Sequence, residues 1–351
     1  MNAVAVVGTV GIPARYGGFE SLVENLVSNR VNSVNYTVYC SGKECNNKQA
    51  QYKGTELKYI NLKANGVQSI PYDIASLISC IFSRPDTTLI LGVSGCIFLP
   101  IYRLLTKSKV ITNIDGLEWK RDKWGKFAKW FLKFSEKLAV RNSDVVIADN
   151  EAIANYVQDE YGIKAEVIAY GGDHAVVDVD ETAEQGDFYL GLCRIEPENN
   201  VHVILDSFSK SGYKLVFIGN WNNSAFGKEL KEYYSKFDNI ILLNPIYDTL
   251  ELYKYRSGCK GYVHGHSAGG TNPSLVEAMH IGKPIFSFDC NFNRYSTNNE
   301  AIYFSNSDDL SMKISRTTDR DMVITSGAMT RIANEKYTWE IIARQYESLY
   351  K

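Results

Sequence analysis

The fold is decided by the segment Gly261–Asp289, which has the sequence GYVHGHSAGGTNPSLVEAMHIGKPIFSFD. Its first four residues and residues 284–289 have the aromatic and branched side chains of buried strands. Asn272 is a favourable N-cap, and Pro273 suits the first helical position because that position needs no N–H. Gly282 suits the end of the helix. The segment therefore predicts a strand, a loop, a helix and a second strand of a parallel sheet.

The loop before this helix has the features of a phosphate-binding site. The first amides of a helix have no partner within the helix, and glycines let an anion approach the backbone closely. Glu277, one turn into the helix, points toward the same end, where it could accept hydrogen bonds from sugar hydroxyls. The alternative is an ordinary capped helix with a solvated Glu. The predicted donor-binding residues here are Gly269, Gly270, Thr271, Asn272, Pro273, Ser274 and Glu277.

Length and composition narrow the class of protein. A chain of 351 residues exceeds the size at which one core usually suffices, so two domains are expected. The net charge of −2 does not indicate a nucleic-acid-binding protein. No stretch is apolar over the roughly 18 residues of a membrane span, and the first residues lack a signal-peptide pattern, so a cytoplasmic protein is expected. The cysteines form no CxxC pair, which indicates reduced packing residues.

Short β-branched runs alternate with helical segments in two successive series, separated by an acidic segment without periodicity. We expect an α/β architecture of two doubly wound, Rossmann-like domains that face a cleft, because ligands bind beyond the carboxyl ends of such strands. The expected divisions are an N-terminal acceptor-side domain over 1–175, a linker over 176–186, a C-terminal donor-binding domain over 187–335, and a C-terminal helix over 336–351 that returns to the N-terminal domain.

The loop after the first strand, GTVGIPARYGGFESLVENL at 8–26, is rich in glycine. A dinucleotide site would need GxGxxG and an acid at the end of the second strand, and neither is present. The loop is interpreted instead as an anion or sugar platform. Gly17 and Gly18 are assigned to the donor site, and Arg15 and Tyr16 to the acceptor side. The alternative for Arg15 is a solvated loop residue.

Two further strand ends carry charged side chains. Arg194 follows the first strand of the second series, where a guanidinium can bind a diphosphate with two hydrogen bonds; an interdomain salt bridge is the alternative. Asp115 and Glu118 follow the fifth strand, where a carboxylate would orient or deprotonate an acceptor hydroxyl. Asp115 is preferred, and its alternative is to cap the following helix. Asp115, Arg194 and Glu277 are the predicted catalytic residues.

Several motifs carry a resemblance to a known family. The strings RIEPENN, GGTNPSLVEAM and YGGFE resemble the retaining nucleotide-sugar glycosyltransferases of the GT-B fold, in the large family numbered four. More narrowly, the chain is similar to the bacterial polysaccharide rhamnosyltransferases in GIPARYGGFESLVENL, NIDGLEWKRDKW, ADNEAIANYV, YGGD and HGHSAGGTNPSLVEAM. The similar motifs extend from the first glycine-rich loop to the closing YTWEIIARQYESLY.

This resemblance implies a function. It implies metal-independent, retaining transfer of a sugar from a nucleotide donor to a lipid-diphosphate-linked saccharide, in the synthesis of a bacterial cell-surface polysaccharide. The implied donor is dTDP-L-rhamnose, without a cofactor or a nucleic-acid partner, and the implied place is the inner face of the cytoplasmic membrane. The alternatives are a UDP- or GDP-linked donor, an epimerase on the same two-domain fold, and a non-catalytic sugar- or nucleotide-binding protein.

The chain departs from the family pattern at two positions. That pattern has two acids eight positions apart, of which the second contacts the donor ribose; Glu277 matches the second, but the first falls on Gly269. The pattern also has an Arg followed five residues later by a Lys at the diphosphate; Arg194 matches, but Asn199 replaces the Lys. The candidates for the role of the missing acid at the donor sugar are a backbone amide, Asn272 and His266.

No metal is expected, because preorganised hydrogen-bond donors around the phosphates can stabilise the leaving diphosphate. DVD at 178–180 and DRD at 319–321 match a metal-binding pattern, but they lie in the linker and in a polar segment and are interpreted as solvated acids. His264 and His266 have a spacing that suits a metal, but no third ligand is evident. His266 is expected to hydrogen-bond the donor sugar or phosphate.

The segment Trp119–Arg141 combines eight Lys or Arg residues with two acids and six aromatic residues. On a helical projection the Lys residues share one face and most aromatic residues the opposite face. Anionic lipids attract Lys near a membrane surface, so a membrane contact is expected. The alternative for the apolar face is packing on the sheet through Phe131, Phe134 and Leu138. The residues expected at the membrane are Trp124, Lys126, Lys129, Trp130 and Lys133.

Overall fold

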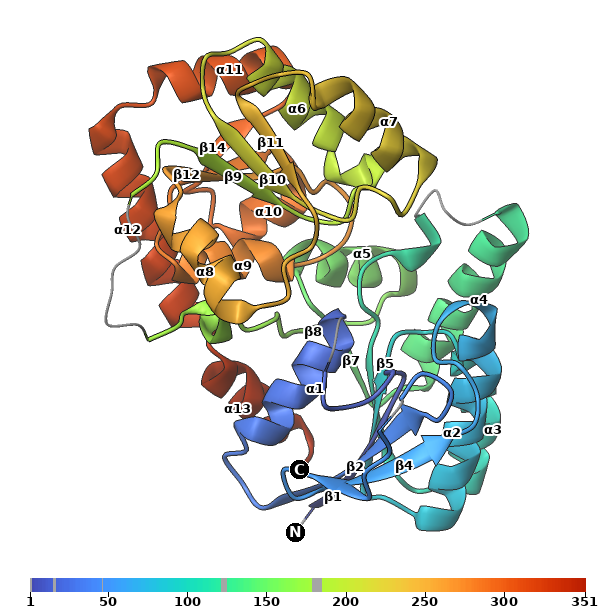
Figure 1. Cartoon of the computed structure of the whole chain (residues 1–351). Helices are drawn as coiled ribbons and strands as arrows, with labels where there is room; N and C mark the ends of the chain where they lie inside the picture. Colours follow the sequence, from blue (N-terminus) through green and yellow to red (C-terminus); the bar gives the residue numbers. More distant parts are fainter. Residues whose placement is uncertain (1, 15–16, 46, 121–124, 179–184) are drawn as a thin grey trace. The chain divides into compact units, whose positions relative to one another are not determined.

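The computed structural model describes residues 2–14, 17–45, 47–120, 125–178 and 185–351 (Figure 1). The chain forms two compact units. The first unit contains Met1–Ala169 together with Trp339–Lys351, and the second unit contains Tyr170–Thr338. All seven cysteines are free thiols.

An eight-stranded sheet forms the centre of the first unit. The strand order is β3-β4-β2-β1-β5-β6-β7-β8. All neighbouring strands are parallel except β3 and β4, so a short antiparallel edge strand extends the predicted parallel sheet. The strands are β1 (Asn2–Val7), β2 (Val34–Ser41), β3 (Gln51–Tyr52), β4 (Thr55–Ile60), β5 (Thr87–Leu91), β6 (Lys109–Asn113), β7 (Val145–Ala148) and β8 (Glu166–Val167).

Helices cover both faces of this sheet. In Figure 1, α2, α3 and α4 lie on one face, and α1 and α13 lie together on the other. Strand order changes direction after β4, and right-handed crossovers then place the following helices on the opposite face from α1. The helices are α1 (Gly18–Ser28), α2 (Ser69–Ser83), α3 (Leu99–Leu105), α4 (Lys126–Asn142), α5 (Glu151–Tyr161) and α13 (Trp339–Leu349).

The last helix, α13, is fixed to the first unit by specific contacts. The Glu347 carboxylate accepts hydrogen bonds from the backbone N–H groups of Val31 at 3.0 Å and Asn32 at 2.7 Å. The side-chain amide of Asn2 donates to the backbone carbonyl of Tyr350 at 2.7 Å. The C-terminal segment therefore completes the first unit and not the second.

The second unit is a parallel α/β unit. Its strand order is β11-β10-β9-β12-β13-β14. The strands are β9 (Tyr189–Leu192), β10 (Leu215–Ile218), β11 (Ile240–Leu243), β12 (Gly261–His264), β13 (Ile285–Phe288) and β14 (Ile302–Phe304). The helices are α6 (Val201–Ser209), α7 (Ala225–Tyr234), α8 (Thr249–Gly258), α9 (Pro273–His280), α10 (Asn291–Ser296), α11 (Ser307–Arg316) and α12 (Asp319–Lys336).

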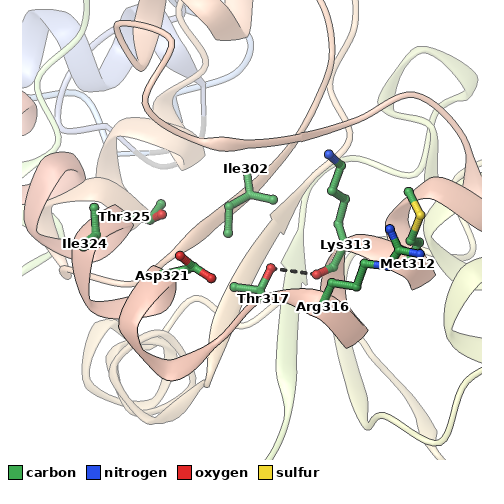
Figure 2. A pocket seen from close by; sticks show the side chains of 8 residues that line it. All are labelled: Ile302, Met312, Lys313, Arg316, Thr317, Asp321, Ile324 and Thr325. Atoms are coloured by element: carbon green, nitrogen blue, oxygen red, sulfur yellow. Dashed lines mark hydrogen bonds between the residues drawn. The ribbon is translucent and has the colours of Figure 1, made fainter.

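A shallow pocket of about 360 Å³ lies between α11, α12 and β14 (Figure 2). It is lined by Ile302, Met312, Lys313, Arg316, Thr317, Asp321, Ile324 and Thr325. The Thr317 hydroxyl donates to the Lys313 backbone carbonyl at 2.6 Å and closes the end of α11. None of the predicted site residues lines this pocket.

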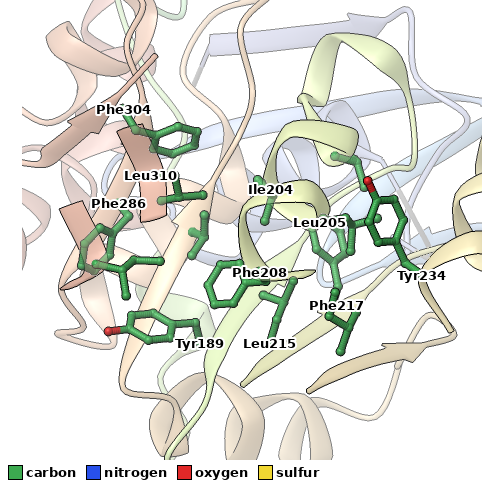
Figure 3. Close-up of a cluster of buried hydrophobic side chains, with 14 of the residues drawn as sticks. Tyr189, Ile204, Leu205, Phe208, Leu215, Phe217, Tyr234, Phe286, Phe304 and Leu310 are labelled. Carbon is green, nitrogen blue, oxygen red and sulfur yellow. The ribbon is translucent and has the colours of Figure 1, made fainter. Parts of the chain in front are cut away.

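The core of the second unit is built around aromatic side chains (Figure 3). The ring of Tyr189 lies 5.6 Å from that of Phe208 and 5.7 Å from that of Phe286, measured between centroids. Such tilted and edge-to-face pairs add about 0.5–1.5 kcal/mol each beyond the burial of their area. The strands that precede the predicted donor residues therefore pack against a close-packed aromatic core.

The strand order reverses once in each unit. The reversal lies between β1 and β5 in the first unit and between β9 and β12 in the second. In open α/β sheets, ligands bind beyond the carboxyl ends of the strands at such a point. The glycine-rich loop follows β1, while Arg194 follows β9 and His266 follows β12. The topology thus brings the predicted donor residues of the second unit to one edge of its sheet.

Candidate active site

Helix α9 begins as the sequence predicts. Asn272 is its N-cap and accepts a hydrogen bond from the backbone N–H of Ser274 at 3.0 Å, while Pro273 occupies the first helical turn. The Ser274 hydroxyl donates to Asn272 at 2.7 Å and accepts from the Tyr262 hydroxyl at 3.1 Å. Gly282, just beyond the helix, has a φ of +74°. Side-chain contacts therefore fix the N-terminus of α9, where the backbone N–H groups have no partner within the helix.

Glu277 lies in α9 with its carboxylate largely buried and paired with a guanidinium and an imidazole. Oε2 contacts the guanidinium of Arg256 from α8, and Oε1 lies 3.3 Å from Nε2 of His174. Burial alone would raise the pKa of Glu277, but the charge of Arg256 and the hydrogen bond from His174 outweigh it and hold that pKa below its usual range. Glu277 is therefore an ionised acceptor in a fixed position.

Sequence reasoning missed both partners of Glu277. Arg256 lies in α8, 21 positions from Glu277 in the chain, and no motif surrounds it. His174 follows the YGGD motif, but it reaches Glu277 only because Gly172 lies against α9. A Cβ on Gly172 would be 2.7 Å from the carbonyl carbon of Val276, so this approach requires glycine.

Arg194 is exposed two residues beyond β9. Its backbone carbonyl accepts a hydrogen bond from the side-chain amide of Asn199 at 2.7 Å. Asn199 ends the short helix η5 (Pro197–Asn199) and is itself buried. The exposed side chain of Arg194 thus extends from a loop whose backbone is fixed by the buried side chain of Asn199.

His266 contacts the residue that replaces the family lysine. Its ring nitrogen Nδ1 lies 2.7 Å from Oδ1 of Asn199, and both side chains are buried. The backbone carbonyl of His266 accepts from the Asn293 side chain at 2.8 Å. Nε2, the other ring nitrogen, lies beside Gly269, because a Cβ on that glycine would be only 2.9 Å from it. The imidazole of His266 thus contacts Asn199, which stands where the family pattern has a lysine, and lies beside Gly269, which stands where the pattern has its first acid.

Backbone contacts join the loops on either side of this imidazole. The backbone N–H of Ser267 donates to the Glu198 carbonyl at 2.9 Å, and the side chain of Asn200 donates to the Gly265 carbonyl at 2.9 Å. A Cβ on Gly265 would lie 2.2 Å from the carbonyl oxygen of Asn199, so a larger residue would separate the loops. The position of His266 is therefore set by both loops.

His264 is buried at the end of β12, and its ring stacks on Tyr262 at 6.0 Å between centroids. Burial and the neighbouring His266 hold the pKa of His264 well below its usual range, so His264 is neutral. In the described part of the chain, no group of three or more His, Cys, Asp or Glu side chains is arranged to hold a metal ion. Asp321 of the DRD motif instead forms a capping box with Thr318 at the start of α12.

The glycine-rich loop of the first unit is organised by an acid. Glu20 is nearly buried, and its Oε1 accepts from the hydroxyl of Thr9 at 2.9 Å and from the backbone N–H of Val10 at 2.7 Å. Gly17 is the N-cap of α1 with a φ of +125°, and Gly18 begins that helix. The predicted acceptor-side residues Arg15 and Tyr16 lie outside the described residues.

Asp115 follows β6 in a strained conformation. Its φ is +58°, which non-glycine residues rarely adopt and which tends to occur at functional sites. Its backbone N–H donates to the side chain of Asn113 at 2.9 Å, and the Asn113 amide donates to the hydroxyl of Tyr346 at 2.7 Å. Helix α4 takes Gly125 as its N-cap. A residue of the last helix thus supports the backbone of the predicted acceptor-side acid.

The helix η3 (Glu118–Lys120) is tied to α4 by a buried acid. Glu136 accepts hydrogen bonds from Trp119 Nε1 at 3.1 Å and from the hydroxyls of Tyr156 and Tyr161 at 2.6 Å each. Burial and the hydrogen bond to Glu136 raise the pKa values of both tyrosines. This cluster fixes the segment that carries Glu118.

Lys133 belongs to the same cluster, and its expected contact with a membrane stays a prediction. Its Nζ lies 4.6 Å from the ring centroids of Trp119 and Tyr156, contacts the Tyr156 hydroxyl, and forms an ion pair with Glu160 at 3.1 Å. Lys133 is therefore engaged within the first unit and does not continue a row of solvent-facing lysines. A helical projection could not reveal this, because its partners come from η3 and α5.

The apolar face of α4 is also not the buried one. Phe127, Trp130 and Phe134 are 77%, 61% and 40% exposed. Their rings form a ladder with centroid distances of 5.9 and 5.8 Å. The side chains that α4 buries are Leu132, Ser135, Glu136, Ala139 and Val140.

Of the three residues in the alternative, Phe134 is exposed, and Phe131 and Leu138 are only partly buried, so they do not form the fully buried side of α4. Lys126 is exposed and Lys129 partly so, and Trp124 lies outside the described residues. Among the described residues, no helix is both long and apolar enough to cross a membrane.

Comparisons with known families divide the chain near the boundary between the two units. Residues 1–173 match the family described as "Domain of unknown function (DUF1972)", and residues 177–321 match the family "Glycosyl transferases group 1". No curated protein sequence matches the chain.

Solved structures share the fold over the whole chain. Sucrose-phosphate synthase from Thermosynechococcus elongatus is 12% identical with a TM-score of 0.84, and the match covers 100% of this chain and 98% of that one. HepE from Anabaena in complex with UDP-glucose is 13% identical, with a TM-score of 0.76 and 99% of each chain covered. The catalytic domain of starch synthase IV from Arabidopsis thaliana, bound to ADP and acarbose, is 12% identical, with a TM-score of 0.74 over 99% of this chain and 98% of that one.

These matches confirm the expected α/β architecture with two Rossmann-like units. The chain shares the GT-B fold of these solved structures, and its residues 177–321 match the glycosyl transferases group 1 family.

Proposed function

We propose that the chain transfers a sugar from a nucleotide donor to an acceptor hydroxyl with retention of configuration and without a metal ion. The observation that carries the proposal is the carboxyl edge of the second sheet. There the side chain of Asn199 joins the backbone carbonyl of the exposed Arg194 to the buried imidazole of His266, and the loop after His266 leads into the capped start of α9. A nucleoside diphosphate offers charge for the guanidinium and the helix amides, and hydroxyls for Glu277.

The chemistry follows from the charge that develops as the sugar–phosphate bond breaks. Negative charge grows on the leaving diphosphate, and preorganised donors that face it lower the barrier. Arg194 and the amides at Gly269–Asn272 are assigned this role. Glu277, kept ionised by Arg256 and His174, accepts hydrogen bonds from the donor ribose. The absence of the family lysine at Asn199 leaves more of this stabilisation to Arg194 and the dipole of α9.

The proposed donor is dTDP-L-rhamnose and the proposed acceptor a lipid-diphosphate-linked saccharide of a bacterial cell-surface polysaccharide. Both rest on the resemblance of the long motifs to polysaccharide rhamnosyltransferases. HepE, which has the same fold, is described with UDP-glucose, so a UDP-linked sugar is the second candidate donor. Asp115, with Glu118 nearby, is assigned to the acceptor hydroxyl; its strained backbone and the support from Asn113 and Tyr346 favour this role.

We place the enzyme at the inner face of the cytoplasmic membrane, as a peripheral protein. The exposed ladder of Phe127, Trp130 and Phe134 supports this, because aromatic side chains favour the boundary of a bilayer. Lys126 and Lys129 would add electrostatic attraction to anionic lipids.

The function is tested by incubating the protein with dTDP-L-rhamnose, UDP-glucose or a GDP-linked sugar and a synthetic lipid-diphosphate-linked acceptor, with EDTA present. We expect a product heavier by one sugar with the anomeric configuration of the donor, and no product with Glu277→Gln. An inverted product, or activity lost to EDTA and restored by Mn²⁺, would refute the proposed mechanism. Conversion of the donor to an isomer without acceptor would indicate the epimerase instead.

A further inference from the structure

The two departures from the family pattern, Gly269 for an acid and Asn199 for a lysine, are in contact through His266. Asn199 has one donor group and one acceptor group at the end of its side chain. Its Nδ2 donates to the Arg194 carbonyl at 2.7 Å, a partner that can only accept. The atom that faces the imidazole at 2.7 Å is therefore Oδ1, which cannot donate.

This arrangement sets the tautomer of His266. A hydrogen bond from Nδ1 to Oδ1 requires the proton on Nδ1, and in the neutral ring Nε2 then has a lone pair and accepts. Nε2 lies next to Gly269, the position of the first acid in the family pattern. An acid there would displace the imidazole from this position, since even a Cβ would lie 2.9 Å from Nε2. The carboxylate of such an acid and Nε2 of the imidazole can each accept a hydrogen bond from a hydroxyl.

We propose that Nε2 of His266 accepts a hydrogen bond from a hydroxyl of the donor sugar, in place of the missing acid, and that Asn199 is a positioning residue that fixes this tautomer. The inference rests on the proposed function, because it deepens the assignment of the same site. It also gives a reason for the loss of the lysine: an ammonium group at position 199 cannot accept the Nδ1 proton and would favour the opposite tautomer.

A matched pair of variants separates the two ring nitrogens. The amide oxygen of Gln reaches about as far as Nε2, whereas the amide of Asn reaches about as far as Nδ1. His266→Asn therefore keeps a donor for Asn199 but removes the acceptor beside Gly269, and His266→Gln does the reverse. Affinities are measured by calorimetry for UDP-glucose against UDP, and for dTDP-L-rhamnose against dTDP.

We expect His266→Asn to lower the affinity for the nucleotide sugar about tenfold, as the loss of one buried hydrogen bond implies. The affinity for the nucleoside diphosphate should be unchanged. His266→Gln should retain most of the sugar affinity. Equal sugar affinity in wild type and His266→Asn would overturn the proposal, as would an equal loss for nucleotide and nucleotide sugar. If the wild-type protein binds neither nucleotide sugar, the proposed function fails instead.

The role of Asn199 has its own readout. Long-range ¹H–¹⁵N correlation spectra of the histidine rings distinguish a protonated Nδ1 from a protonated Nε2. We expect His266 of the wild type to carry its proton on Nδ1, and Asn199→Leu, which has a similar size, to lose that preference together with the added affinity of the sugar. A wild-type ring protonated on Nε2, or an unchanged tautomer in Asn199→Leu, would refute the positioning role.

Discussion

At the scale of single residues, Glu277 shows how an acid is kept charged inside a fold. Its carboxylate is 14% exposed and depends on Arg256, whose side chain is 11% exposed. Removing one partner of a buried pair leaves the other charge uncompensated. We expect Arg256→Met to destabilise the protein by about 3 kcal/mol and to weaken donor binding, measured by urea unfolding and calorimetry.

Two further variants separate the causes of this loss. Arg256→Met combined with Glu277→Gln should recover stability but not donor binding, because the uncompensated charge is then gone while the acceptor is still altered. Arg344→Met, which breaks the exposed Arg344–Glu340 pair on α13, should change stability little. Unchanged stability in Arg256→Met would show that the ion pair with Glu277 is not maintained in solution.

Asp73 provides a second residue-scale prediction, on pH. It is buried in α2, and burial raises its pKa to about 8, although a hydrogen bond from the Gly95 backbone opposes the shift. An acid with a raised pKa is protonated in the folded state and ionised after unfolding. Its contribution therefore falls between about pH 4 and pH 8, by up to about 1.4 kcal/mol per pH unit.

Asp73→Asn keeps the acceptor for Gly95 and cannot ionise. We expect its free energy of unfolding to match that of the wild type near pH 4 and to exceed it at pH 8, both measured by urea titration. A stability difference between the two proteins that does not change with pH would contradict the raised pKa.

At the scale of elements, α4 turns its aromatic ladder outward, and this predicts lipid binding. Phe127→Ser, Trp130→Ser and Phe134→Ser together should weaken binding to vesicles of phosphatidylcholine and phosphatidylglycerol about tenfold or more, because each ring loses apolar area that a bilayer would bury. Added salt should weaken wild-type binding through the lysines. Flotation or light scattering measures both effects.

The control replaces two exposed aromatic residues of the second unit, Tyr233 and Tyr247, by serine. Their loss should leave vesicle binding unchanged. If the wild-type protein ignores anionic vesicles at low salt, or the α4 variant binds equally well, the ladder has another role.

Helix α9 was predictable from local chemistry, whereas the long-range contacts of its side chains were not predictable. An N-cap, a proline and a terminal glycine lie within eleven residues and specify that helix by themselves. The partners of Glu277 come from α8 and from a loop that glycine packing brings close, so no local pattern identifies them. The side chains that α4 buries were not predictable from the sequence, because a projection shows that a helix is amphipathic but not that Glu136 inside it would accept hydrogen bonds from Trp119, Tyr156 and Tyr161.

At the scale of the whole molecule, the proposed donor residues Arg194, His266 and Glu277 belong to the second unit and Asp115 to the first. Binding of the donor and activation of the acceptor should therefore be separable. Asp115→Asn should lower kcat for transfer by about 10²–10⁴-fold while the dissociation constant of the nucleotide sugar stays within about twofold of the wild type. A parallel loss of donor affinity would indicate that Asp115 contributes to donor binding or to the stability of the fold.

The first unit is interrupted in the chain by the second, since Trp339–Lys351 is separated from Ala169 by all of Tyr170–Thr338. During synthesis on the ribosome, the second unit therefore emerges complete while the first still lacks the helix that covers Val31 and Asn32. Domains generally fold as they emerge, from the N-terminus onward. Here that order is changed in part: the first unit is completed only after the whole of the second unit has been synthesised, so in a nascent chain the unit that begins first is finished last.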